Sequence, residues 1–158
     1  MPSAIRRFWV LSGIALCAVL AGPVAMAQAS DNTMRRTLNN YAPKIVKDEN
    51  AVKTGLVGYP QGKVKPLVHA LNHEVGDLRA LKGKLARETP STSRGTKAKR
   101  LIISGLGLIA NAYGALRRDI KVARGGPVPQ AKVAVAVRTD KKGRTKLLAG
   151  LNLLRRAA

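Results

Sequence analysis

A regular spacing of small and branched apolar residues between positions 95 and 123 constrains the fold more than any other part of the chain. Small residues recur every seven positions, and larger apolar residues recur at the same interval on the neighbouring line. The small residues are Ala98, Gly105 and Ala112, and the larger ones are Ile102, Ile109 and Leu116. Steps of four and three positions are typical of an amphipathic helix with one buried face. Because small residues let a partner backbone approach closely, we expect this helix to be a packing element.

A second helix is predicted over residues 64–88. Its leucines follow the same spacing, with Glu74 at the one position where a leucine is missing. The leucines are Leu67, Leu71, Leu78, Leu81 and Leu85. The polar connector 89–95 contains a proline that stops the helix, and serine and threonine residues that can cap the next one. A short connection between helices of similar length favours antiparallel packing, so residues 64–123 are predicted to form a helical hairpin.

The flanking segments give weaker patterns. Residues 30–62 contain Pro43, which interrupts helical hydrogen bonding, so one kinked helix or two short helices are expected there, followed by a glycine-rich loop at 55–62. Residues 129–156 are expected to form a pair of short helices. Their first part, 132–138, alternates like a strand but has no partner strand, so a short helix is the better interpretation. The fold class is therefore predicted as all-α, a small bundle of four or five helices.

Residues 147–154 resemble residues 102–109 at an offset of 45 positions, and each segment follows a basic stretch. Three positions are identical between the two segments, namely Gly105/Gly150, Leu106/Leu151 and Leu108/Leu153. Chance and an internal duplication are both compatible with so few identities.

Residues 1–29 have the order of a secretory signal peptide. Two arginines precede an uncharged apolar run, and small-residue cleavage sites follow after Ala27 and Ala29. The general secretory and twin-arginine routes both stay open. Removal of this segment takes away two of the 29 basic residues, none of the 8 acidic ones and the only cysteine, so that residues 30–158 carry a net charge of +19. We expect one basic helical domain in a secreted or periplasmic location.

Two clusters of cations are the most informative functional feature. Each lies at the start of a predicted helix, the first at the central helix and the second at the last one. The first cluster is Arg94, Lys97, Lys99 and Arg100, and the second is Arg138, Lys141, Lys142, Arg144 and Lys146. Cations at a helix start oppose the helix dipole, whereas an anion bound to the free N–H groups there is stabilised. These nine residues are the candidate polyanion-binding residues, and a solvated stretch that only keeps the protein soluble is the alternative.

Three further patterns have weaker support. His69, His73 and Asp77 share one helix face and form a weak candidate metal site, although that face is opposite the leucines. The GxGxxA pattern at 105–110 falls inside a helix rather than after a strand, so a dinucleotide site is not expected. Residues 101–116 are uncharged but shorter than a membrane span, which favours a buried core helix. No cofactor and no catalytic cluster is predicted.

These patterns predict an exported, non-enzymatic protein that associates electrostatically with a polyanion of the cell envelope or exterior. Cell-wall polymer, anionic lipid headgroups and nucleic acid are the candidate partners. Nucleic acid would be bound without sequence specificity, since few aromatic residues are present to stack on bases. The alternative is a structural or protein-interaction bundle whose charge serves solubility and whose partner uses the helical seam. The sequence does not define the oligomeric state.

Overall fold

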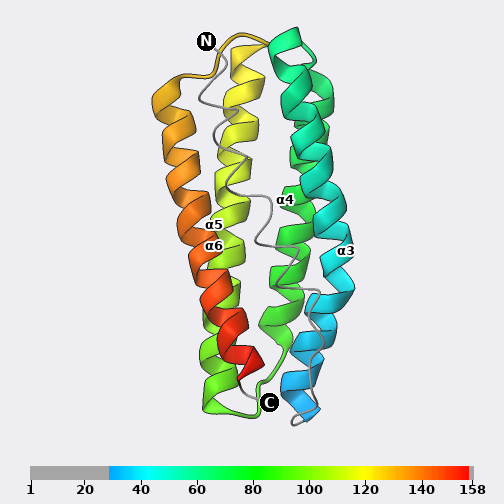
Figure 1. The fold of residues 1–158 in the computed structure, drawn as a ribbon, viewed down its shortest axis with the longest axis vertical. Helices are drawn as coiled ribbons and strands as arrows, with labels where there is room; N and C mark the ends of the chain where they lie inside the picture. The colour runs from blue at the N-terminus through cyan, green and yellow to red at the C-terminus, as the bar shows by residue number, and fades with distance from the viewer. Residues whose placement is uncertain (1–28, 157–158) are drawn as a thin grey trace.

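The structure, a computed structural model, describes residues 29–156. This part of the chain forms four long helices and one short 3-10 helix, and it contains no strand. The elements are α3 (Ala29–Gly58), η1 (Tyr59–Gln61), α4 (Val64–Arg87), α5 (Ser93–Ala123) and α6 (Gln130–Arg155). The helices lie side by side, and their connections alternate between the two ends of the bundle, so helices adjacent in sequence are antiparallel (Figure 1). The predicted all-α bundle is confirmed. The predicted signal peptide, apart from its last residue, lies outside the described residues.

The helical hairpin predicted from the sequence is formed by α4 and α5. The side chain of Thr92, the N-cap residue of α5, accepts a hydrogen bond from the N–H of Gly95 at 2.8 Å. All five leucines of the predicted α4 stripe are at most 2% exposed. Each such side chain contributes on the order of 2 kcal/mol when it leaves water, which outweighs the poor helix propensity of the glycines in α4.

The seven-residue seam of α5 packs against α6. A Cβ on Gly105 would lie 2.6 Å from the carbonyl oxygen of Gly143, and a Cβ on Gly150 would lie 2.9 Å from that of Ala98. No side chain fits at such distances, so the two backbones touch at these glycines. Gly105 and Gly150 occupy matching positions in the two similar segments 102–109 and 147–154. Each allows the backbones of α5 and α6 to come into contact at the same interface.

The prediction of two short helices over 129–156 is wrong, because α6 is one continuous helix. Gly143 lies in its middle without breaking it. A Cβ there would lie 2.9 Å from the carbonyl oxygen of Gly105, so this glycine serves close packing rather than a turn. The segment 132–138 is helical, with Val133 and Ala136 buried.

Residues 29–58 form one helix, which decides between the two alternatives that Pro43 left open. Pro43 lies on the exposed side of α3. The loop predicted at 55–62 is wrong in its first half, since residues 55–58 complete α3. A Cβ on Gly55 would lie 2.8 Å from the Cα of Leu67, so the glycine allows α3 and α4 to approach and is not a helix stop.

Polar contacts connect α3 and α6. The close backbone contacts run from α3 to α4, from α4 to α5 and from α5 to α6. Between α3 and α6, the Nη2 of Arg35 donates to the carbonyl oxygen of Leu154 at 2.5 Å, and Arg144 on α6 reaches Glu49 on α3. Side chains that reach across the core therefore complete the ring of four helices.

Candidate functional site

Acidic and basic residues are distributed very differently in the bundle. Within residues 31–156, none of the eight acidic side chains is exposed, whereas 21 of the 27 Lys and Arg residues are. The buried acids are Asp31, Glu49, Glu74 and Asp140, and the half-buried ones are Asp48, Asp77, Glu88 and Asp119. The exposed surface of this part of the chain is therefore charged almost entirely by cations, which occur on all four helices.

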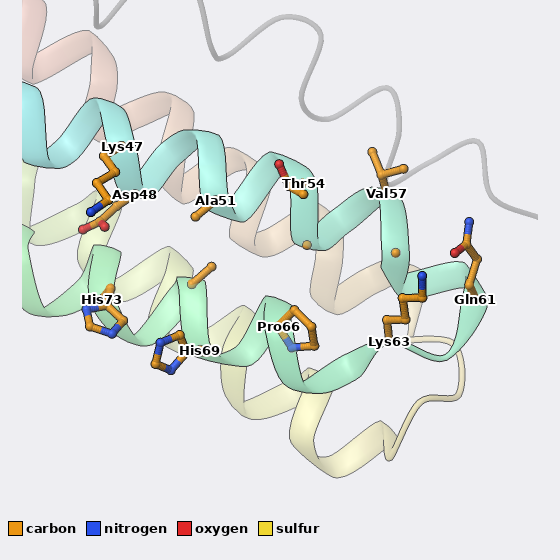
Figure 2. A pocket seen from close by; sticks show the side chains of 13 residues that line it. Lys47, Asp48, Ala51, Thr54, Val57, Gln61, Lys63, Pro66, His69 and His73 are labelled. Carbon is orange, nitrogen blue, oxygen red and sulfur yellow. The ribbon is translucent and has the colours of Figure 1, made fainter.

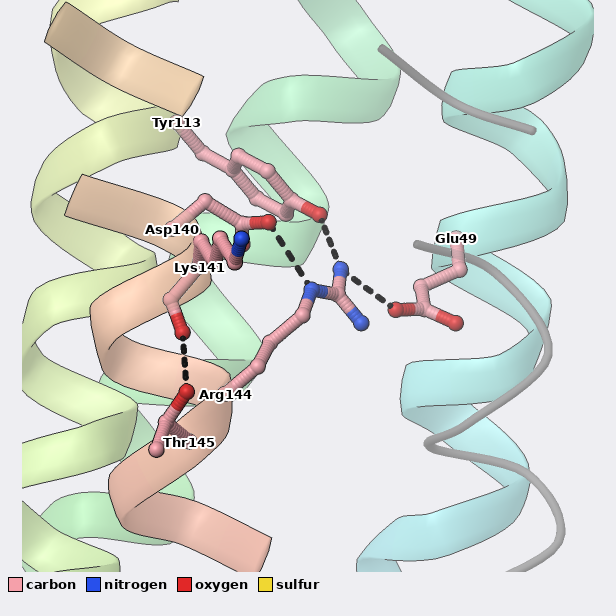
Figure 3. Close-up of polar contacts among 6 residues, drawn as sticks. All are labelled: Glu49, Tyr113, Asp140, Lys141, Arg144 and Thr145. Atoms are coloured by element: carbon pink, nitrogen blue, oxygen red, sulfur yellow. Dashed lines mark hydrogen bonds and ion pairs between the residues drawn. The ribbon is translucent and has the colours of Figure 1, made fainter. Parts of the chain in front are cut away.

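Two of the buried acids pair with Arg144 in the centre of the bundle (Figure 3), and the charge of Arg144 also acts on a third, Glu74. The Nη2 of Arg144 donates to Glu49 at 3.0 Å and to the hydroxyl of Tyr113 at 2.7 Å, and its Nε donates to Asp140 at 2.9 Å. Glu74 contributes a further carboxyl from α4. Each of the four helices thus places at least one polar side chain in this cluster.

Burial controls the protonation of these acids. The pKa of Glu74 is raised to about 9, mainly by burial and to a smaller extent by the nearby carboxyls of Glu49 and Asp48. Burial also raises the pKa of Glu49 and of Asp140, although the charge of Arg144 opposes the rise in both. Glu74 is therefore neutral at pH 7, and Arg144 has two carboxylates to pair with.

Arg144 was predicted to bind a polyanion, and the structure places it elsewhere. Its side chain is buried and paired with Glu49 and Asp140. Sequence position alone put it in the cation cluster 138–146, but the face of α6 on which it lies points into the core. An external polymer does not reach it.

The second cation cluster also lies in a different place from the predicted one. Since α6 begins at Gln130, the cluster is in the middle of that helix and not at its start. The dipole argument therefore does not apply to it. Arg138, Lys141 and Lys142 are exposed, and the Nζ of Lys146 donates to the hydroxyl of Ser104 on α5 at 3.0 Å.

The first cluster does lie in the opening turns of α5, as predicted. Lys97 and Arg100 are exposed, and Arg94 donates to the carbonyl oxygen of Arg156 at 2.6 Å. Lys99 has an internal role, because its ammonium donates to the carbonyl oxygens of Ala86 at 2.7 Å and of Glu88. Lys99 thus caps the C-terminus of α4, where free carbonyl groups favour a cation.

The N-terminus of α5 already holds an anion that belongs to the chain. Asp31, in the first turn of α3, accepts hydrogen bonds from the N–H of Ser91 at 3.3 Å and from the hydroxyl of Thr92 at 2.8 Å. A Cβ on Gly95 would lie 2.5 Å from the Oδ1 of Asp31. The anion expected at this helix start is therefore an internal carboxylate, and an external anion has to bind on the outer face.

A groove between α4 and α5 combines cations of both helices. It has a volume of about 570 Å³ and runs along the solvent side of the hairpin. Its polar lining consists of Lys82, Thr96, Lys99, Arg100, Ser104 and Asn111. No carboxylate lines it. Lys82 was not among the residues predicted from the sequence, because it lies on α4, 12 positions before the first cation of the cluster on α5, and only the hairpin brings it alongside.

A larger groove of about 840 Å³ lies between α3 and α4 (Figure 2). Lys47, Lys63 and Asp48 line it together with His69 and His73, whose ring centroids are 4.5 Å apart. Its charge is mixed, because Asp48 lies at one end. This groove is therefore a weaker anion site than the one between α4 and α5.

The histidine candidates do not form a metal site. Asp77 lies near Asp48, and its charge contributes to the raised pKa of that residue after the larger effect of burial. Even so, the described residues contain no group of three or more His, Cys, Asp or Glu side chains placed to hold a metal ion. His69, His73 and Asp77 carry no metal proposal.

The remaining sequence patterns are accounted for by packing. Gly105 and Ala110 of the GxGxxA pattern are buried in the middle of α5, far from its N-terminus. None of the helices described for residues 29–156 has the length and apolar character needed to cross a membrane.

Comparison with models of protein families, with curated protein sequences and with solved structures finds no match for this chain. Its function therefore has to be inferred from the residues described above.

Proposed function

We propose that this chain is an exported, non-enzymatic helical protein that associates electrostatically with a polyanion of the cell envelope or exterior. The observation that supports this proposal is the separation of charge. All eight acids are buried or half-buried, while 21 of the 27 described cations are exposed. Few surface carboxylates are left to compete with a polymer for the cations.

Release of counterions from the polymer supplies the driving force. A linear polyanion carries condensed cations, and each Lys or Arg that replaces one returns it to solution. Such binding weakens steeply with salt, because surface charges are screened beyond about 10 Å at 0.1 M ionic strength. A solubility role alone requires a net charge but no such partner.

The alternative role, a protein-interaction bundle that uses the helical seam, has less support. The seam residues Ala98, Gly105 and Ala112 are buried, and the backbone of α6 packs against α5 at Ala98 and Gly105 within the same chain. A partner helix therefore has no access to the seam unless α6 leaves it.

A pull-down from the native envelope at low and at moderate salt tests the proposal. We expect an anionic polymer to be retained at low salt and released at moderate salt. Capture of a protein that survives moderate salt, with no salt-sensitive polyanion, supports the interaction bundle instead. N-terminal sequencing of the envelope form checks export, since cleavage after Ala27 or Ala29 leaves Gln28 or Ser30 first.

A further inference from the structure

We propose that the groove between α4 and α5 binds a phosphodiester group of the polyanion. This inference rests on the proposed electrostatic function and adds the chemistry of the ligand and its place. The cations of the groove come from both walls, Lys82 from α4 and Arg100 from α5, and the hydroxyl of Ser104 lies between the helices. No acidic side chain is among the lining residues.

The two cations are available for a ligand. Lys82 and Arg100 are exposed, and neither forms an ion pair with another residue of the range 29–156. Lys99 instead neutralises the carbonyl groups at the end of α4, which would otherwise repel an anion in the groove. Lys146 adds a charge from α6 at the edge of the groove through its hydrogen bond to Ser104. Cations from three helices, α4, α5 and α6, therefore lie in or beside the groove.

A glycine makes room for Lys82. A Cβ on Gly107 would lie 3.4 Å from the Nζ of Lys82, so the ammonium rests on the surface of α5 where that helix lacks a side chain. A large residue at position 107 would displace the ammonium and fill the groove. A substitution at position 107 can therefore change the shape of the groove without changing the net charge of the protein.

The arrangement of donors favours a phosphodiester over a carboxylate. A planar carboxylate is satisfied by two parallel bonds from one guanidinium, whereas a tetrahedral phosphate accepts donors from several directions. Here the ammonium of Lys82 lies on the wall formed by α4, and the guanidinium of Arg100 and the hydroxyl of Ser104 lie on the wall formed by α5.

A soluble polymer also fits better than a membrane. The large apolar side chains exposed in the described part are Val57, Val122 and Val135, which lie on three different helices. They form no apolar face that would enter a bilayer. We therefore expect the phosphodiester to belong to a linear polymer.

The test compares two double variants that each remove two exposed charges, one from α4 and one from α5. Lys82→Gln with Arg100→Gln changes the groove, and Arg79→Gln with Arg118→Gln is the matched control outside it. The probe is an oligomer of abasic deoxyribose phosphates, with polyaspartate of equal charge number as the comparison. We expect the groove variant to lose roughly tenfold more affinity for the phosphodiester oligomer than the control does.

Gly107→Leu keeps the net charge and should also weaken binding of the oligomer. Circular dichroism shows whether it folds, and the double variant carries the test if it does not. Equal losses in both double variants would overturn the groove but leave the electrostatic function intact. Equal affinity for polyaspartate would overturn the phosphodiester preference. Binding to neither polymer at low salt would overturn both proposals, and groove-dependent binding that is tighter to phosphatidylglycerol vesicles would identify a membrane as the partner.

Discussion

The carboxylate of Asp31 lies against the backbone of Gly95, so close that a Cβ on the glycine would be 2.5 Å from the Oδ1 of the aspartate. The contact joins the first turn of α3 to the first turn of α5. It places a buried negative charge where the dipole of α5 is positive, and hydrogen bonds from Ser91 and Thr92 hold it there.

Asp31→Asn should destabilise the protein by about 1–2 kcal/mol, because the charge at the start of α5 is lost while the shape is kept. Denaturant unfolding at neutral pH measures the change. Asp119→Asn is the control, since Asp119 forms a half-exposed ion pair with Lys132 whose loss should cost less than about 1 kcal/mol. Equal costs would mean that the position at the helix start is unimportant.

Glu74 should make the protein less stable as pH rises. Its pKa is about 9 in the folded chain and near 4.5 in the unfolded chain, so between these values only the folded state keeps the proton. The contribution of this group is full below pH 4.5 and falls by about 1.4 kcal/mol per pH unit until pH 9. Glu74→Gln should flatten the dependence of unfolding free energy on pH between 5 and 9. Glu88→Gln, at a half-buried position, serves as the control, and identical slopes in all three proteins would contradict the assignment.

Arg144→Leu should cost about 3–5 kcal/mol at pH 8, because it leaves the carboxylates of Glu49 and Asp140 buried without a cation. The loss should shrink toward pH 5, since burial raises the pKa of both acids and protonation removes their charge. Lys142→Leu, at an exposed position on the same helix, should change the unfolding free energy by less than about 0.5 kcal/mol. A loss that does not depend on pH would show that packing, and not charge, is what Arg144 supplies.

Gly105→Ala should destabilise the bundle, by about 1–3 kcal/mol or more, because the new methyl group meets the backbone of α6 at Gly143 and Leu147. Gly76→Ala is the opposite case. A Cβ there meets nothing within 4 Å, and alanine favours the helix by about 1 kcal/mol. Thermal melting of the two variants should therefore move in opposite directions, and a stabilised Gly105→Ala would show that α5 and α6 are not in backbone contact.

Periodic features of the sequence predicted the fold well. The leucine stripe and the seven-residue seam each follow from local spacing, and both are buried. Glycine misled the prediction at the end of α3. Gly55 was assigned to a loop, but it lies where the backbone of α4 comes close, and only the tertiary structure shows that.

The candidate site was predicted less well for a similar reason. Arg144 and Lys142 are two positions apart in one basic run, yet one is buried and the other exposed. Their difference depends on which face of α6 packs into the core, and the basic run itself does not indicate that face. Asp31 is separated from Gly95 by the whole of α4, so no local pattern indicates that it occupies the start of α5.

Exposed cations on every helix have a consequence for how such a protein meets a long polymer. A protein with cations on only one side binds a single polymer chain. A protein with cations on all sides can bind two polymer chains at once. Under the proposed function the bundle is a cross-linker. Mixing it with the polymer near equal charge should then give turbidity that clears on adding excess of either component, as bridging between strands gives way to saturation of one partner.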